Sequence, residues 1–153
     1  MPSHRHLSRI AVVQTLFAWE FRGGDPEVIL QYVLTQFYPE LTEVEFVKET
    51  LKGVLARREE IKTLITETAP EWSFEKIAPL DRVILEIGVY ELIAETDVPP
   101  IVAINEAIEM AKQFGNTNAP KFINGVLSTV MKKCHKTPGK DKKKSVNPPS
   151  DGK

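Results

Sequence analysis

Apolar residues recur at steps of three and four along almost the whole chain up to residue 134. The first stripe runs through Leu7, Ile10, Val13 and Phe17, and this spacing places the four side chains on one face of a helix. Alternating patterns typical of strands are nearly absent. The pattern therefore predicts an all-α protein of six or seven helices. The first expected helix ends at Gly23-Gly24, and the second begins at Asp25-Pro26 and ends before Pro39. The others are expected at about residues 42–68, 80–94, 100–114 and from Asn118 to about residue 134.

Helix start and stop signals divide these stripes. Gly23-Gly24 predicts the end of the first helix, and Asp25-Pro26 supplies an N-cap and a first-turn proline for the second. Thr42-Glu-Val-Glu45 has the spacing of a capping box, so we expect a helix to begin there. Gly53 weakens the long helix that follows, and a break is expected near Ala56–Arg58.

Residues 80–94 differ from the other stripes because apolar side chains cover more than half of the helix circumference. A helix of this kind is usually surrounded by others, so it is expected at the centre of the core. Residues 135–153 are mainly Lys, Pro, Gly, Ser and Asp, and this composition predicts a disordered tail. The expected organisation is one helical domain, residues 1–134, followed by a Lys-rich tail.

Composition narrows the class of protein. Of the 153 residues, 42% are hydrophobic, which is enough for a core. The longest apolar stretches are far shorter than the roughly 18–20 residues of a membrane span, and the start lacks the apolar segment of a signal peptide. We therefore expect a cytoplasmic protein with no membrane segment. The single Cys134 excludes an intramolecular disulfide.

The net charge of −1 hides an uneven distribution. Residues 1–9 carry two Arg and no acid, and residues 132–153 carry eight Lys and two Asp. The segment 10–131 has ten basic and nineteen acidic side chains. Two basic ends suit a polyanion such as nucleic acid, whereas the acidic middle suits a different partner.

The residues used in catalysis and metal binding are not grouped in this sequence. His4, His6 and His135 lie in the two charged ends, and no metal-binding, nucleophile or phosphate-loop motif is present. Cys134-His135 could suggest a thiol–imidazole pair, but adjacent helical residues point about 100° apart. The sequence therefore predicts a protein that is not an enzyme and needs neither metal nor cofactor.

Two groups of residues are candidates for RNA binding. Arg5 and Arg9 stand at a helix N-terminus, where the helix dipole disfavours cations; RNA binding is one role for them, and a solvated terminus is the simpler one. Lys121 and Phe122 follow the loop Asn116–Asn118. A helix start, side-chain amides, a cation and an aromatic ring can together hold phosphate and stack a base. Taken alone, Phe122 is more typical of a core residue.

Three stretches of the chain carry a resemblance. The first stretch is Arg5-His-Leu-Ser-Arg9 followed by Ala11-Val-Val-Gln-Thr-Leu-Phe-Ala-Trp19. The second is Asp81-Arg-Val-Ile-Leu-Glu-Ile-Gly-Val-Tyr-Glu-Leu92. The third is Ile104-Asn-Glu-Ala-Ile-Glu-Met-Ala-Lys-Gln-Phe-Gly115 followed by Lys121-Phe-Ile-Asn-Gly-Val-Leu127. Together they resemble the NusB family of bacterial transcription antitermination factors over about residues 3–134. Asn105-Glu106 and Asn124-Gly125 are the most specific matches.

The resemblance implies a small all-helical fold of two packed three-helix units without catalytic activity. It also implies binding to the boxA element of ribosomal RNA leader transcripts, as a heterodimer with NusE, a small-subunit ribosomal protein. That complex joins RNA polymerase and other factors and keeps the polymerase from terminating early. The free chain is expected to be a monomer or a weak homodimer.

Positions in the matched motifs assign RNA contacts to the start of the chain. Arg5, His6 and Arg9 are expected to contact phosphates. Phe17 stands where the family often has Tyr, near the RNA, and its ring can stack but cannot donate a hydrogen bond. The arginine-rich start of the family is usually denser, so this chain has less fixed charge there.

The same motifs assign a second set of contacts to the other half of the chain. Asn118, Lys121 and Phe122 are expected to form the opposite side of the RNA groove. The acidic middle, including Asp81 and Glu91, is expected to face the basic ribosomal protein.

Several features depart from the family or lack an RNA-binding explanation. Glu86 stands where the family commonly has Arg, and the tail around Lys140–Lys144 is outside the family pattern; it either adds phosphate affinity or only aids solubility. Gly125 inside a helix costs about 1 kcal/mol, so we expect a close helix–helix approach there. Trp19 and Trp72 are interpreted as packing residues with the indole N–H near the surface.

Two other functions remain open from the sequence. The same helical module can precede an RNA cytosine methyltransferase domain, although this sequence contains no strand-rich region or catalytic cysteine motif. The second is a protein adaptor that never touches RNA. RNA titrations with and without NusE would separate the adaptor from the RNA-binding factor, and a methyl-transfer assay would detect the enzyme.

Overall fold

A computed structural model describes residues 3–94 and 96–135. These residues form seven α-helices and one short 3-10 helix, and no strand is found among them. The all-α prediction is confirmed, and the expected break in the 42–68 segment is the junction of α3 and α4. The elements are α1 (His4–Arg22), α2 (Pro26–Phe37), α3 (Val44–Ala56), α4 (Arg58–Thr68), η1 (Phe74–Lys76), α5 (Pro79–Ile93), α6 (Pro100–Phe114) and α7 (Ala119–His135).

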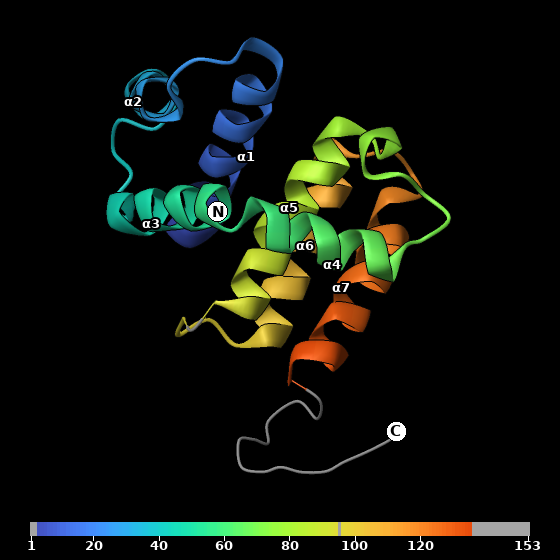
Figure 1. Ribbon diagram of the computed structural model, residues 1–153. Helices are drawn as coiled ribbons and strands as arrows, with labels where there is room; N and C mark the ends of the chain where they lie inside the picture. The colour runs from blue at the N-terminus through green and yellow to red at the C-terminus, as the bar shows by residue number, and fades with distance from the viewer. Residues whose placement is uncertain (1–2, 95, 136–153) are drawn as a thin grey trace.

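The helices pack as two three-helix units. In the first unit α1 contacts both α2 and α3, and in the second α5, α6 and α7 contact one another (Figure 1). Helix α4 lies against α5 and α7, and α1 and α3 contact α5 to join the two units. This arrangement agrees with the two-unit fold that the resemblance implies. No helix in the described part of the chain is long and apolar enough to span a membrane.

Helix α5 is the centre of the core, as its apolar circumference predicts. Ten of its 15 residues are buried, and it contacts α1, α3, α4, α6 and α7. Because α5 is enclosed, the charged residues it carries are also removed from water. Asp81, Glu86 and Glu91 are the three buried acids of this helix, and each of them bears on the function discussed below.

Two of the predicted helix signals have different outcomes. Asp25 caps α2 as expected, since its carboxylate accepts a hydrogen bond from the Glu27 N–H at 2.9 Å. The capping box predicted at Thr42 is wrong, because α3 begins at Val44 and has no side-chain cap. The N-cap position belongs to Glu43, and the Thr42 hydroxyl lies 3.2 Å from His4 Nδ1 instead.

A close approach of two helices is expected at Gly125, but in the structure it occurs at Gly88. A Cβ added at Gly125 would meet no atom within 4 Å, so that prediction is wrong. At Gly88 of α5, by contrast, an added Cβ would lie 2.8 Å from Leu127 Cδ1 of α7. Leu127 is fully buried, so its side chain has little space to move. The two helices therefore approach closely at Gly88.

This difference predicts opposite effects for two glycine-to-alanine changes. Gly88→Ala is expected to destabilise the protein by about 1–3 kcal/mol, because the methyl group overpacks the α5–α7 contact. Gly125→Ala is expected to stabilise it by up to about 1 kcal/mol, because alanine is the better helix former and meets nothing. Urea unfolding followed by circular dichroism measures both. Changes of the same sign in the two variants would contradict this account of the packing.

Candidate nucleic-acid interface

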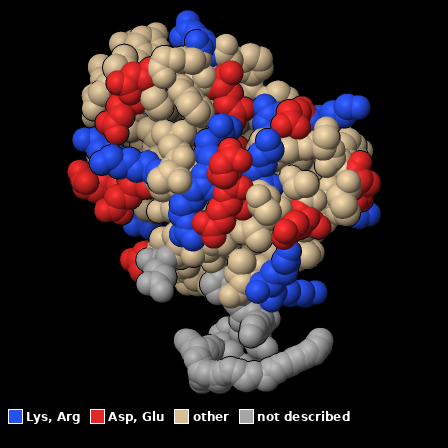
Figure 2. Space-filling view, in the orientation of Figure 1, with Lys and Arg blue, Asp and Glu red and all other residues tan. Residues whose placement is uncertain are grey.

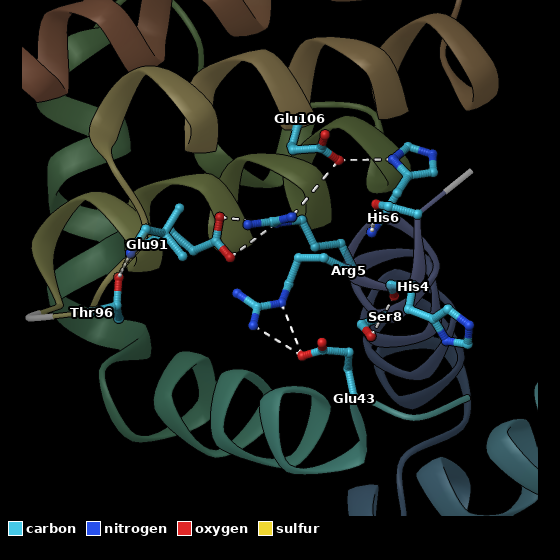
Figure 3. A network of polar contacts seen from close by, with 11 residues as sticks. His4, Arg5, His6, Ser8, Glu43, Glu91, Thr96 and Glu106 are labelled. Carbon is cyan, nitrogen blue, oxygen red and sulfur yellow. Dashed lines mark hydrogen bonds and ion pairs between the residues drawn. The ribbon is translucent and has the colours of Figure 1, made fainter. Parts of the chain in front are cut away.

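The basic start of the chain forms the first turns of α1. Ser3 caps the helix, its hydroxyl accepting from the His6 N–H at 3.0 Å. The Arg5 guanidinium donates to Glu43 Oε1 at 2.9 and 3.2 Å, and His6 Nδ1 lies 2.8 Å from Glu106 Oε1 (Figure 3). Both basic side chains are half-buried. A phosphate bound here would therefore compete with two carboxylates for these groups.

Arg9 lies inside the protein. Its Nε donates to both carboxylate oxygens of Glu91, at 3.0 and 3.2 Å, and its Nη1 lies 3.8 Å from Glu106 Oε1. The Arg9 and Glu91 side chains are each only 2% exposed. Burial raises the pKa of the Glu91 carboxyl, and the Arg9 charge opposes that rise. The guanidinium also lies over the Phe46 ring, 5.2 Å from its centre.

These positions correct two expectations. Arg9 was expected to contact phosphate, but in this conformation its charge is neutralised by an internal carboxylate and is shielded from solvent. Glu91 was expected to face a protein partner, but it is the buried half of the same pair. The ion pair ties α1 to α5, so both residues hold the interface in place without forming its surface.

Phe17 lies further along α1, on the surface of the first unit. Its ring packs edge-on against Phe21, with ring centres 4.8 Å apart and an interplanar angle of 63°. Phe21 is 67% exposed, so the pair forms an accessible aromatic surface. Such a surface can stack on a base, which is the property that the resemblance assigns to Phe17.

The second candidate group surrounds the start of α7. Asn116 orders the preceding loop, its Oδ1 accepting from the Asn118 N–H at 2.9 Å. Asn118 and Lys121 are exposed, and Phe122 is half-buried. The Phe122 ring faces Trp72, with ring centres 6.1 Å apart and an interplanar angle of 60°. The loop, the cation and an aromatic pair are thus close together.

A pocket of about 300 Å³ opens beside this aromatic pair. We call it the Trp72–Phe122 pocket. It lies where the segment before α5 meets the loop between α6 and α7. The lining residues with polar or aromatic side chains are Trp72, Lys76, Asp81, Asn116, Asn118 and Phe122.

Two of these lining residues were missed by sequence reasoning. Trp72 was interpreted as a packing residue, yet it is 48% exposed. Lys76, at the end of η1, has no predicted role. The available signal was an aromatic residue and a lysine in the short connection that follows Pro70, since functional side chains often lie in such connections.

The two candidate groups are separated by α6. Within residues 3–94 and 96–135, no hydrogen bond, ion pair or ring contact joins Arg5 or His6 to Lys121 or Phe122. His6 instead contacts Glu106 in the middle of α6, and α6 leads into the loop at Asn116. Helix α6 therefore links the two groups, through Glu106 at one end and the loop at Asn116 at the other.

On the face shown in Figure 2, charge is not separated into one basic patch. In the view of Figure 2 the Lys and Arg side chains alternate with Asp and Glu side chains. Three of the basic groups in the described part of α1 already have acidic partners, as given above for Arg5, His6 and Arg9. Among the described residues no group of three or more His, Cys, Asp and Glu could hold a metal ion.

Glu86 lies in a second internal network. Its Oε2 accepts from Arg58 Nη2 at 3.2 Å, and Arg58 also donates to Glu20 at 3.0 Å. Arg82 donates to the other Glu20 oxygen at 2.8 Å. Burial, reinforced by the nearby Glu20 charge, raises the pKa of Glu86 to about 7, although Arg58 opposes the rise.

Comparisons with known proteins agree on one family. The model of the NusB family matches residues 6–132. The transcription antitermination protein NusB of Geobacter sulfurreducens is 38% identical over 127 residues, covering 82% of this chain and 92% of that protein. Its counterpart from Bacillus pumilus is 37% identical over 126 residues, covering 82% of this chain and 93% of that one.

Solved structures give the same result. The NusB structure from T. maritima has 34% sequence identity and a TM-score of 0.78, covering 87% of this chain and 94% of that one. A crystal structure of the antitermination factors NusB and NusE in complex with dsRNA contains a chain of 25% identity and TM-score 0.78. That match covers 87% of this chain and 99% of the other.

Proposed function

The chain belongs to the NusB family of non-catalytic transcription antitermination factors, and we propose that it binds boxA-type single-stranded RNA of ribosomal RNA leader transcripts as a heterodimer with NusE. The bound complex then helps RNA polymerase resist termination, and it acts in the cytoplasm. The observation that carries this proposal is the match to NusB proteins over most of their length, together with a similar chain whose crystal structure includes NusE and RNA.

The proposed RNA face has two parts. The first is the start of α1, where Arg5 and His6 supply partly exposed basic groups and Phe17 supplies a ring for stacking. The second is the start of α7, where Lys121 binds phosphate and Asn118 and Phe122 contact bases. Arg9 supports the first part from inside, through its pair with Glu91.

The ion pairs at the start of α1 explain why a partner is part of the proposal. Arg5 donates to Glu43 and His6 contacts Glu106, so much of the local positive charge is neutralised. Single-strand affinity depends strongly on phosphate neutralisation. A basic ribosomal protein that covers acidic side chains of this chain would add the positive charge that the isolated chain lacks. RNA affinity is therefore expected to be low alone and higher in the complex with NusE.

Charge-changing variants test the proposed face. Arg5→Ala and Lys121→Ala are each expected to weaken binding of a boxA-like RNA to the NusE complex several-fold and to lower the salt slope by about 0.7. Glu43→Gln is expected to act in the opposite direction, because it removes the carboxylate that competes for Arg5. Filter binding at several salt concentrations measures all three changes.

The matched control is Lys133→Ala, since this lysine is exposed near the end of α7 and pairs with Glu67. It should leave RNA affinity nearly unchanged. Equal affinity of wild type, Arg5→Ala and Lys121→Ala would refute the proposed face. The complete absence of RNA binding, with NusE binding intact, would favour the protein adaptor instead.

A further inference from the structure

Helix α2 carries more apolar residues than its packing buries. Seven of its 12 residues are Val, Ile, Leu, Tyr or Phe, but only Leu30, Val33 and Leu34 are buried. Its main packing partner is α1, and it lies at the outer edge of the first unit, with α1 between it and α5 (Figure 1). The outward side of α2 is therefore left to solvent.

The exposed apolar residues of α2 adjoin one another. Val28 and Tyr32 are 64% and 59% exposed, and their spacing of four residues places them on one side of the helix. Phe37 is also 59% exposed, and its ring centre lies 6.4 Å from that of Tyr32. We call these three residues the α2 patch. Single exposed apolar residues are ordinary, whereas adjoining ones mark interaction surfaces.

No charge interrupts the α2 patch. The other residues on the outward side of the helix are Gln31, Thr35 and Gln36, which are exposed and neutral. Glu27, in the first turn, is the one charged residue of α2. The solvent-facing side of a surface helix usually carries several charged residues. This side of α2 therefore has the composition of an interface.

The border of the α2 patch is acidic. Residues 23–47 contain five acidic side chains and no Lys, Arg or His. Asp25 and Glu27 lie at the start of α2, and Glu40 follows its end; all three are exposed. Within the described part of the chain these three carboxylates form no ion pair. They repel RNA phosphates and attract a basic partner.

We propose that the α2 patch docks an amphipathic helix of a further protein in the transcription complex, one whose apolar stripe is flanked by Lys or Arg. A helical stripe packs along another helix by fitting its ridges into the grooves of that helix. The basic flanks meet the acids at the two ends of α2. This inference rests on the proposed function for its setting, but it uses none of the residues proposed to contact RNA. A second copy of the chain is a poor occupant, because it brings a second set of unpaired acids and no base.

Two synthetic peptides of about 15 residues test the chemistry of the partner. Both form an amphipathic helix with the same leucine stripe, and the flanking positions are Lys in one peptide and Glu in the other. The full chain is titrated into each labelled peptide, and fluorescence anisotropy gives the affinity. The Lys peptide is expected to bind at least about tenfold more tightly than the Glu peptide. Equal affinities, or no binding of either peptide, would overturn the proposal.

Substitutions then locate the binding surface. Val28→Ser combined with Tyr32→Ser is expected to weaken binding of the Lys peptide at least about tenfold, because it removes central apolar contacts. Ile101→Ser combined with Val102→Ser is the matched control, since these residues are 58% and 40% exposed on α6; it should keep the affinity. Circular dichroism confirms that both variants are folded. Equal losses in the two double variants would reject the α2 patch.

Other uses of the α2 patch are tested with the same Val28→Ser, Tyr32→Ser protein. Sedimentation velocity should give the same oligomeric state as the wild type. The affinity for NusE, and that of the NusE complex for a boxA-like RNA, should also be unchanged. A change in any of these would assign the patch to a second copy, to NusE or to RNA, and would overturn the proposal.

Terminator read-through separates this inference from the proposed function. In a transcription extract depleted of this protein, adding back the wild type with NusE is expected to raise read-through on a template that encodes boxA. The double variant should lose at least about half of that gain. No gain with the wild type would reject the proposed function, and the peptide titrations would still decide the α2 patch. A full gain with the double variant would overturn docking to a protein of the transcription complex.

Discussion

Arg9→Met is expected to destabilise the protein by about 3–5 kcal/mol at neutral pH. The substitution keeps most of the side-chain volume but leaves Glu91 buried without its main partner. Glu91 is 2% exposed and receives two hydrogen bonds from Arg9. Its pKa, already raised by burial, would rise further once the guanidinium is lost. The destabilisation should therefore be smaller at pH 5, because protonating the Glu91 carboxyl costs less free energy at that pH than at neutral pH.

A double-mutant cycle separates the lost pair from lost packing. Arg9→Met with Glu91→Met removes both charges, and such replacements of a buried ion pair by apolar residues are often neutral. The double variant should thus be more stable than Arg9→Met alone. Urea unfolding of the four proteins gives the coupling energy. A double variant whose loss equals the sum of the two single losses would show that the ion pair is not the cause.

The same variant distinguishes the two roles considered for Arg9. A residue that contacts phosphate lowers the salt dependence of RNA binding when it is replaced, whereas a buried residue does not. We expect Arg9→Met to lower the stability strongly and to leave the salt slope unchanged in the folded protein. Arg5→Ala should show the reverse, because Arg5 is half-exposed and pairs with Glu43 at the surface.

The helices could be predicted from the sequence because their signals are local. Apolar spacing, glycine stops and proline at the first turn act within a few residues. Gly23, for example, ends α1 with a positive φ of 72°, as its position in the pattern suggests. The Thr42 capping box failed for the opposite reason, since His4, distant in sequence, provides a competing partner.

The site residues were harder to predict because their roles depend on distant partners. Arg9 and Glu91 are 82 positions apart, and no local pattern indicates that they form a buried pair. Gly88 and Gly125 both weaken a helix, yet only the first faces a neighbouring helix. Trp72 and Phe122 come from different elements and face each other where α7 packs against α5. The motif resemblance indicated the two candidate RNA-binding regions, at the starts of α1 and α7. Which of their side chains are exposed could be read only from the structure.

Glu86 predicts an unusual pH dependence of stability. Its pKa is about 7 in the folded protein against an ordinary value of 4.5. Between these pH values the folded state binds more protons than the unfolded state, so stability falls as pH rises through the window. The fall is at most about 3.5 kcal/mol, since each pKa unit corresponds to about 1.4 kcal/mol. The contribution levels off about one pH unit above the folded-state pKa of about 7.

Glu86→Gln should remove most of this dependence. The glutamine oxygen can still accept from Arg58, and Arg58 keeps its bond to Glu20. We expect the variant to be about 1–3 kcal/mol more stable than the wild type at pH 8 and similar at pH 5. Urea unfolding at pH 5, 6, 7 and 8 measures the difference, with Glu40→Gln, at an exposed acid outside this network, as the control. Parallel pH profiles for the wild type and Glu86→Gln would disprove the assignment.

The same network shows how the buried Glu86 is accommodated. Arg58 and Arg82 both bind Glu20, so a third arginine at position 86 would leave the group with a single acid. Glutamate gives two acids and two arginines when it is ionised. When it is protonated, the group keeps one net positive charge beside a cavity of about 460 Å³ lined by Trp19 and Phe74, where water can solvate that charge. The group is therefore neutral when Glu86 is ionised and carries one positive charge when Glu86 is protonated.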